Sequence, residues 1–209
     1  MTSLLLASAS PARAALLRAA GVQPLIHPAD VDEDAVLAAA RADQPALPPR
    51  DAVALLARAK AEHVAASGPA ADLVLGCDSL LELDGQALGK PRTAEVARRR
   101  WRTMRGRTGV LHTGHWLIRT APPAGGKSTA VGAVSSTAVT FADITDAELE
   151  AYLATGEPLA VAGGFTIDGR GGAFVRRIDG DHHTVVGLSL VTLRELLPRV
   201  GYQWIDLWT

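Results

Sequence analysis

The chain has 209 residues, of which 48% are hydrophobic and 21% charged, and its formal net charge is −1. No general basic field exists to hold a polyanion, so we expect no binding to polymeric nucleic acid. No apolar stretch is long enough to cross a bilayer, and the sole cysteine, Cys77, excludes an internal disulfide. We therefore expect a cytoplasmic protein with no membrane partner, built as one domain or as two lobes around one cleft.

The first third of the sequence alternates apolar runs with helical patterns. Pro11 suits a first helical position and Ser10 suits the N-cap before it. The elements expected here are a strand over 3–8, a helix over 11–20, a short strand with an acidic loop over 22–33, and helices over 34–42 and 50–67.

The rest of the sequence continues this alternation. Asp84 and Gly85 predict a tight turn, and residues 121–127 predict a flexible loop. The expected elements are a strand over 72–83 interrupted around 76–79, a helix over 93–104, strands over 109–120 and 128–141, a helix over 145–155, glycine-punctuated strands over 162–181, a helix over 189–197 and a strand over 202–208. The order predicts an α/β protein with a mixed sheet.

The segment around Pro11 could bind an anion. A strand that ends in small residues and turns into a helix leaves N–H groups free at the positive end of the helix dipole. Ser8 and Ser10 add hydroxyl donors, and Arg13 shares the inward face of Leu16 and Leu17. From this local pattern alone, an ordinary Ser-Pro helix start with an arginine that reaches outward to water is the more frequent case.

Three further charged residues stand in positions that suit chemistry. Lys60 lies on the apolar stripe of its predicted helix, and only three of the 21 basic residues are lysines. Asp78 directly follows an apolar run, so we expect it at a strand end, where it could hold a metal or accept a proton. Lys90 lies between a glycine and a proline on a shaped loop. The alternatives are a lysine that reaches outward to water at 60, a turn former at 78 and a solvated charge at 90.

The histidines give no clear metal site. His112 and His115 differ by three positions on a predicted strand, so they face opposite ways. The DGDHH segment at 179–183 is better explained as an Asp-Gly turn with polar tips. No CxxC, HExxH, GxSxG, GxGxxG or Walker A pattern occurs, which argues against several common enzyme classes.

Six segments, taken together in order and spacing, resemble the Maf family of nucleotide pyrophosphatases. SASPARAALL resembles its S-x-S-P-R-R-x-E-L-L opening, VDED at 31–34 its V-D-E segment, and ARAKA its L-A-x-x-K-A helix. LGCDSLLELDGQALGKP resembles its G-A-D-T-V-V…G-x-x-L-G-K-P motif, and GRTGVLHTG its G-R-T-H-x-V-x-T-G. GEPLAVAGGFTIDGRGGAFVRRIDGDHHTVVGLSL resembles the long block that ends in V-V-G-L-P-L.

The resemblance implies a single Maf-like domain over residues 1–209 with an elongated mixed sheet, flanking helices and two lobes around a deep cleft. This fold is related to that of the inosine-triphosphate pyrophosphatases. The implied activity is cleavage of a nucleoside triphosphate, standard or modified, to the monophosphate and pyrophosphate with a divalent cation, Mg²⁺ or Mn²⁺. The family name also refers to septum formation and division arrest. A homodimer remains open.

The resemblance also implies roles for particular residues. Asp78, Lys60, Lys90 and Glu33 would be catalytic, and Glu33 and Asp78 would hold the metal. Asp78 is also the candidate proton acceptor for the attacking water, a role in tension with metal binding. The substrate would bind to Ser8, Ser10, Ala12, Arg13, Ser79 and Asp168.

The sequence also departs from the family motifs. Ala12, Ser79 and Asp168 replace residues associated with base selectivity, so a pyrimidine preference is not implied, and Gly109 replaces a histidine. The alternative to an enzyme is a nucleotide-binding regulator without turnover. The four retained charges at Glu33, Lys60, Asp78 and Lys90 favour the enzyme, because binding alone needs no base.

Overall fold

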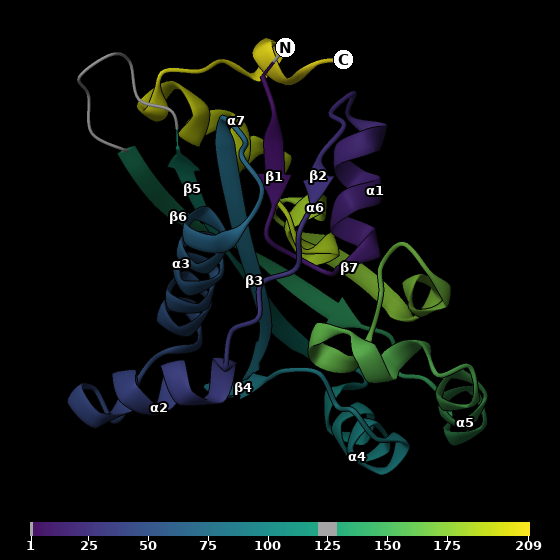
Figure 1. The fold of residues 1–209 in the computed structure, drawn as a ribbon. Helices are drawn as coiled ribbons and strands as arrows, with labels where there is room; N and C mark the ends of the chain where they lie inside the picture. Colours follow the sequence, from purple (N-terminus) through teal and green to yellow (C-terminus); the bar gives the residue numbers. More distant parts are fainter. Residues whose placement is uncertain (1, 121–128) are drawn as a thin grey trace.

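Residues 2–120 and 129–209 are described here from a computed structural model, so the loop predicted over 121–127 lies outside the described residues. One mixed sheet runs through the molecule, and its long strands are flanked by helices (Figure 1). The strand order is β2-β1-β3-β5-β6-β7, with β4 paired to β3. The strands are β1 (Leu4–Leu6), β2 (Leu25–Ile26), β3 (Leu73–Leu83), β4 (Gln86–Leu88), β5 (Thr108–Arg119), β6 (Thr129–Phe141) and β7 (Val175–Asp179).

The strand pairing confirms the predicted mixed sheet. β1 is parallel to both β2 and β3, whereas the β3–β4, β3–β5, β5–β6 and β6–β7 pairs are antiparallel. Asp84 and Gly85 make the expected tight turn between β3 and β4, with φ angles of 52° and 75°.

Except for a short helix over 182–186, which the sequence does not predict, the α-helices lie close to where the sequence predicts them. They are α1 (Pro11–Ala19), α2 (Glu33–Asp43), α3 (Pro49–Ser67), α4 (Ala94–Met104), α5 (Asp146–Ala154), α6 (His182–Val186) and α7 (Leu190–Leu196). Ser10 caps α1 and Pro11 begins it, as expected. Among the described residues, no helix is both long enough and apolar enough to cross a membrane.

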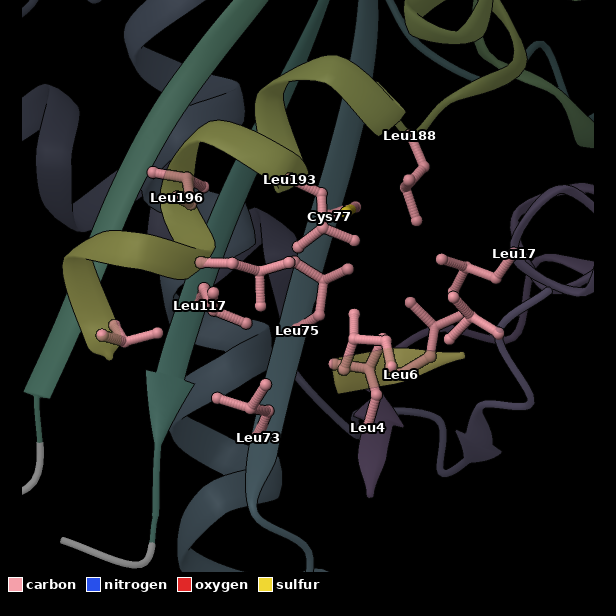
Figure 2. Close-up of a cluster of buried hydrophobic side chains, with 14 of the residues drawn as sticks. Leu4, Leu6, Leu17, Leu73, Leu75, Cys77, Leu117, Leu188, Leu193 and Leu196 are labelled. Carbon is pink, nitrogen blue, oxygen red and sulfur yellow. The ribbon is translucent and has the colours of Figure 1, made fainter. Parts of the chain in front are cut away.

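Helices cover both faces of the central strands. Leu75, Cys77 and Leu117 point to one face, where they pack against Leu193 and Leu196 of α7 (Figure 2). The alternate residues of the same strands point to the other face and pack against α3, because successive side chains of a strand alternate. A second core lies near α4 and α5 and contains Trp101, Phe141 and Tyr152.

The predicted interruption of β3 around 76–79 is wrong. Gly76 stays paired with Trp116, and its role is to let α3 approach the sheet. A Cβ atom on Gly76 would lie 2.1 Å from the Ala57 carbonyl oxygen, and one on Gly114 would lie 2.2 Å from that of Val53. Glycine in a strand can mark a close approach of another backbone as well as a break.

Two predictions for the C-terminal third are also wrong. Residues 162–181 contain only one strand, β7, and are otherwise built around the 3₁₀ turns Ala162–Gly164 and Arg170–Phe174. Residues 202–208 form the 3₁₀ turn Trp204–Leu207, with a single bridge between Val22 and Trp208. The DGDHH segment does turn, but Asp181 then caps α6 through the His183 N–H.

Candidate active site

A cavity of about 430 Å³ opens beside the edge of β3. β1 pairs with β3 only at Leu73–Leu75, and β4 pairs with it only at Leu81–Leu83. The edge between these pairings carries Asp78 and Ser79 and is left open to the cavity. The sequence predicts Asp78 at a strand end, and this is wrong because Asp78 lies within β3. Asp78 is exposed to the cavity because the neighbouring strand β1 ends at Leu6.

All ten residues proposed from the sequence line this one cavity. They are Ser8, Ser10, Ala12, Arg13, Glu33, Lys60, Asp78, Ser79, Lys90 and Asp168. The cavity is also lined by residues that the sequence did not single out, among them Pro28, Ala29, Leu111, Phe165, Thr166 and Gly187. Most of these offer a backbone or an apolar wall, which leaves no recognisable pattern in a sequence.

Lys60 joins two carboxylates that come from different elements. Its Nζ lies 2.7 Å from Glu33 Oε1 at the start of α2 and 2.5 Å from Asp78 Oδ1 on β3. The Lys60 and Asp78 side chains are 12% and 11% exposed, whereas that of Glu33 is 44% exposed. Lys60 therefore does not simply reach outward to water, because its ammonium is held at the cavity wall between two negative charges.

The two carboxylates differ in their acidity. Burial raises the pKa of Asp78, although the nearby charges of Lys60 and Arg13 oppose this. For Glu33, burial also raises the pKa, but the hydrogen bond and charge of Lys60 outweigh it, with help from Lys90 and Arg13, and the pKa is lowered. Such a difference is typical of paired carboxylates that divide acid–base and electrostatic roles.

The donor set fits a divalent cation that is shared with a substrate. Glu33 and Asp78 each give one oxygen to Lys60, and within the described ranges the second oxygen of each accepts no hydrogen bond. The described residues contain no group of three or more histidine, cysteine or acidic side chains that could hold a metal. Mg²⁺ commonly uses one or two carboxylates and takes its other ligands from phosphate and water.

Arg13 points inward and is held by the protein itself. Its Nε donates to the Gly187 carbonyl at 2.6 Å, and its NH1 donates to Ser8 Oγ and the Cys77 carbonyl, both at 2.9 Å. Its NH2 donates to Ser79 Oγ at 3.1 Å. A guanidinium has five N–H donors, so one is left for a ligand. The alternative in which Arg13 reaches outward to water is wrong. Arg13 can offer a ligand its positive charge and one N–H group, but not a pair of parallel hydrogen bonds.

The turn before α1 presents hydroxyl protons. Ser8 Oγ accepts from the Ser10 N–H and from Arg13, and Ser10 Oγ accepts from the Arg13 N–H. The proton of each hydroxyl is then available to an anion. The helix start itself offers less than expected, since Pro11 has no N–H and the Arg13 N–H is capped; among the described residues, the Ala12 N–H has no partner.

The sequence is similar to a protein family and to known proteins along almost its whole length. The family model described as "Maf-like protein" matches residues 3–200. The chain belongs to this family. A "Nucleoside triphosphate pyrophosphatase" of Leifsonia xyli subsp. xyli (strain CTCB07) is 56% identical over 208 residues, covering 98% of this chain and 96% of its own length. A protein of the same name from Rhodococcus jostii (strain RHA1) is 51% identical over 215 residues, covering 100% and 97%.

The resemblance to the Maf family implies a catalytic role for Lys90 and a substrate contact for Asp168, and it shows Gly109 in place of a histidine. Lys90 is exposed on the loop after β4, and Arg100 donates to the Gly89 carbonyl beside it at 2.6 Å. Asp168 is exposed on the segment that follows Phe165. Gly109 lies outside the cavity lining, and a Cβ there would be 2.9 Å from the Glu82 carbonyl oxygen. A histidine at 109 would therefore require the neighbouring strand to shift.

Proposed function

We propose that this Maf family protein is a nucleoside triphosphate pyrophosphatase, which releases the monophosphate and pyrophosphate. The observation that supports this most is the Lys60 ammonium between Glu33 and Asp78 at the wall of the cavity. The names of the curated relatives agree with the proposal. A triphosphate carries about four negative charges near neutral pH, and a site for its hydrolysis must offset them while water attacks.

The cationic residues bind and orient the triphosphate. Arg13, Lys60 and Lys90 supply fixed positive charge, and the hydroxyls of Ser8 and Ser10 donate to phosphate oxygens. When bound, a divalent cation, Mg²⁺ or Mn²⁺, polarises phosphate oxygens as a Lewis acid, and Glu33 and Asp78 would hold it.

Asp78 is our candidate for the group that accepts a proton from the attacking water. Its Oδ1 is bound to Lys60, so its Oδ2 is the oxygen left for this step. The same oxygen cannot hold a cation and take the proton at once. Its burial and the raised pKa support the base role, whereas the more exposed Glu33 suits the cation.

We further propose that part of the cavity wall contacts the nucleobase. Ala12, Ser79 and Asp168 line the cavity, at positions that the resemblance associates with base selectivity. Ser79 Oγ accepts from Arg13 and lies 2.9 Å from Thr113 Oγ1, which itself donates to the Thr184 carbonyl. Ser79 therefore donates its hydroxyl proton to Thr113 Oγ1, and it can act toward a nucleobase only as a hydrogen-bond acceptor.

The test measures pyrophosphate and orthophosphate separately over a panel of nucleoside triphosphates that includes methylated and deaminated bases. Each is assayed with Mg²⁺, with Mn²⁺ and in excess chelator. We expect pyrophosphate as the first product, and only with metal. Orthophosphate as the first product, or full activity in chelator, would show that the proposal is wrong. Tight binding without turnover of any substrate would favour the regulator.

We further propose that residues 1–209 act as one domain in the cytoplasm, as a homodimer and in connection with division arrest. The dimer is supported by β6, whose outer edge pairs with β7 only from Ala138 onward; among the described residues the edge before it pairs with no strand. Sedimentation velocity tests the dimer, and cell length on overexpression tests the link to division.

A further inference from the structure

The carboxylate of Glu157 is the centre of a hydrogen-bond cluster beside the cavity. Its Oε1 accepts from the Tyr152 hydroxyl at 2.9 Å, the Thr166 hydroxyl at 2.5 Å and the Gly171 N–H at 2.9 Å. Its Oε2 accepts from the Arg170 N–H at 3.1 Å. The Tyr152 oxygen also accepts from the Thr166 N–H at 3.3 Å. One side chain therefore fixes both ends of the loop over residues 165–171.

The loop is fitted closely around this carboxylate. A Cβ on Gly169 would lie 3.0 Å from both Glu157 carboxylate oxygens and 2.5 Å from Thr166 Oγ1. A Cβ on Gly171 would lie 2.4 Å from the Tyr152 hydroxyl oxygen. These distances are too short for a larger side chain, so both glycines allow the loop to wrap around Glu157.

Uncharged hydroxyl and N–H donors hold this negative charge. Within the described residues, no ion pair involves Glu157. Burial raises the pKa of Glu157, but the hydrogen bonds from Thr166, Gly171, Arg170 and Tyr152 outweigh it and lower the pKa. Hydrogen bonds to an ionised acceptor are about twice as strong as neutral ones, which makes the cluster rigid.

The same loop forms part of the cavity wall. Phe165, Thr166 and Asp168 line the cavity, whereas Glu157 is not among its lining residues. Thr166 links the two sides, because it binds Glu157 and also lines the cavity. The phosphate-binding groups proposed above, such as Arg13 and Lys60, come from other elements and make no hydrogen bond to Glu157 in the described part of the chain.

We infer that Glu157 is a positioning residue that fixes the 165–171 loop and thereby sets affinity for the nucleoside part of the substrate, without contacting the triphosphate. The inference rests on the proposed function. Its consequence is that binding of the nucleoside and binding of the phosphates can be changed separately.

The experiment compares Glu157→Gln with the wild-type protein. The amide keeps the shape of the carboxylate, but its NH₂ group must replace one of the two oxygens. In one orientation the NH₂ group faces the Arg170 N–H, and in the other it faces the three donors that Oε1 accepts from, so at least one donor loses its acceptor. We expect KM for the best nucleoside triphosphate to rise about tenfold, with kcat within about twofold. The inhibition constant of inorganic tripolyphosphate, which has no nucleoside, should stay unchanged.

Two further variants separate positioning from loss of folding. Glu148→Gln also removes an ionised acceptor that binds a hydroxyl and an N–H, both of Thr145, but at the start of α5 and outside the cavity lining, so its KM should match the wild type. Tyr152→Phe removes one of the four donors to Glu157 and should raise KM in the same direction by a smaller factor.

Equal rises in KM and in the tripolyphosphate constant would overturn the inference, as would a fall in kcat alone with KM unchanged. If the wild-type protein releases no pyrophosphate, the proposed function fails. The same comparison is then made by calorimetry, with a nucleoside triphosphate and tripolyphosphate as the two ligands. A loss confined to the nucleoside triphosphate still supports the role of Glu157, and an equal loss for both refutes it.

Discussion

Replacing Arg13 with lysine tests whether this arginine holds the site together. Lysine keeps the charge but gathers its three N–H donors on one atom. It cannot reach the carbonyls of Cys77 and Gly187 and the hydroxyls of Ser8 and Ser79 at the same time. We expect two or three of these four bonds to be lost. At about 1.5 kcal/mol for each hydrogen bond to a charged group, the free energy of unfolding should fall by about 3–5 kcal/mol.

Urea unfolding followed by circular dichroism measures this change. The matched control is Arg18→Lys, which changes an exposed arginine in the last turn of the same helix and should stay within about 0.5 kcal/mol of the wild type. For a chain of this length, the melting temperature should fall by roughly 2–4 °C per kcal/mol. If Arg13→Lys is as stable as the control, the four hydrogen bonds of Arg13 do not hold the site together and our structural reasoning is wrong.

Three further changes test the centre of the site and the core behind it. Lys60→Arg should fail to restore the activity lost in Lys60→Ala, because a planar fork does not fit a point between two carboxylates; near-normal turnover would contradict this. Asp78→Asn should lower turnover by about 10²–10⁴-fold, while the nucleotide affinity measured without metal stays within a few-fold of the wild type. The control Glu62→Gln changes an exposed carboxylate and should leave the rate unchanged. If extra metal partly restores the rate of Asp78→Asn, Asp78 is a metal ligand and not the base. Burial lowers the pKa of His115 to about 4. Between pH 6.5 and 4 the imidazole is therefore protonated in the unfolded chain but neutral in the folded chain. The free energy of unfolding should fall by up to about 3 kcal/mol as the pH drops through this window. His115→Gln, which keeps an acceptor for the Ser189 N–H, should remove that share of the slope in urea unfolding at pH 7 and 4.5, and an unchanged slope would refute it.

Much of the fold follows from local patterns. Ser10 and Pro11 begin a helix because their backbone and side-chain chemistry is satisfied at a helix start wherever it lies. The turn at Asp84 and Gly85 follows from their tolerance of positive φ. The predictions fail where glycine is ambiguous. Gly76 looks like a break in a strand, and only the approach of α3 shows that it is needed for packing.

The sequence also singled out some of the residues that line the cavity, because charged side chains on apolar stripes need an explanation wherever the chain folds. Lys60 is such a residue, Asp78 stands out because it directly follows an apolar run, and Glu33 is implied only by the family resemblance. It could not show that all three meet, since they lie on separate elements and their contact depends on how α2 and α3 pack against β3.

The surroundings of Arg13 and Glu157 were decided by tertiary structure alone. Arg13 donates to the carbonyls of Cys77, 64 residues away, and Gly187, 174 residues away. Glu157 accepts backbone N–H groups of Arg170 and Gly171. Every residue has a carbonyl and nearly every residue an N–H, so such partners leave no mark in a sequence. The sequence therefore predicts which side chains belong to this site, whereas the backbone groups that orient these side chains are determined only by the packing of the folded chain.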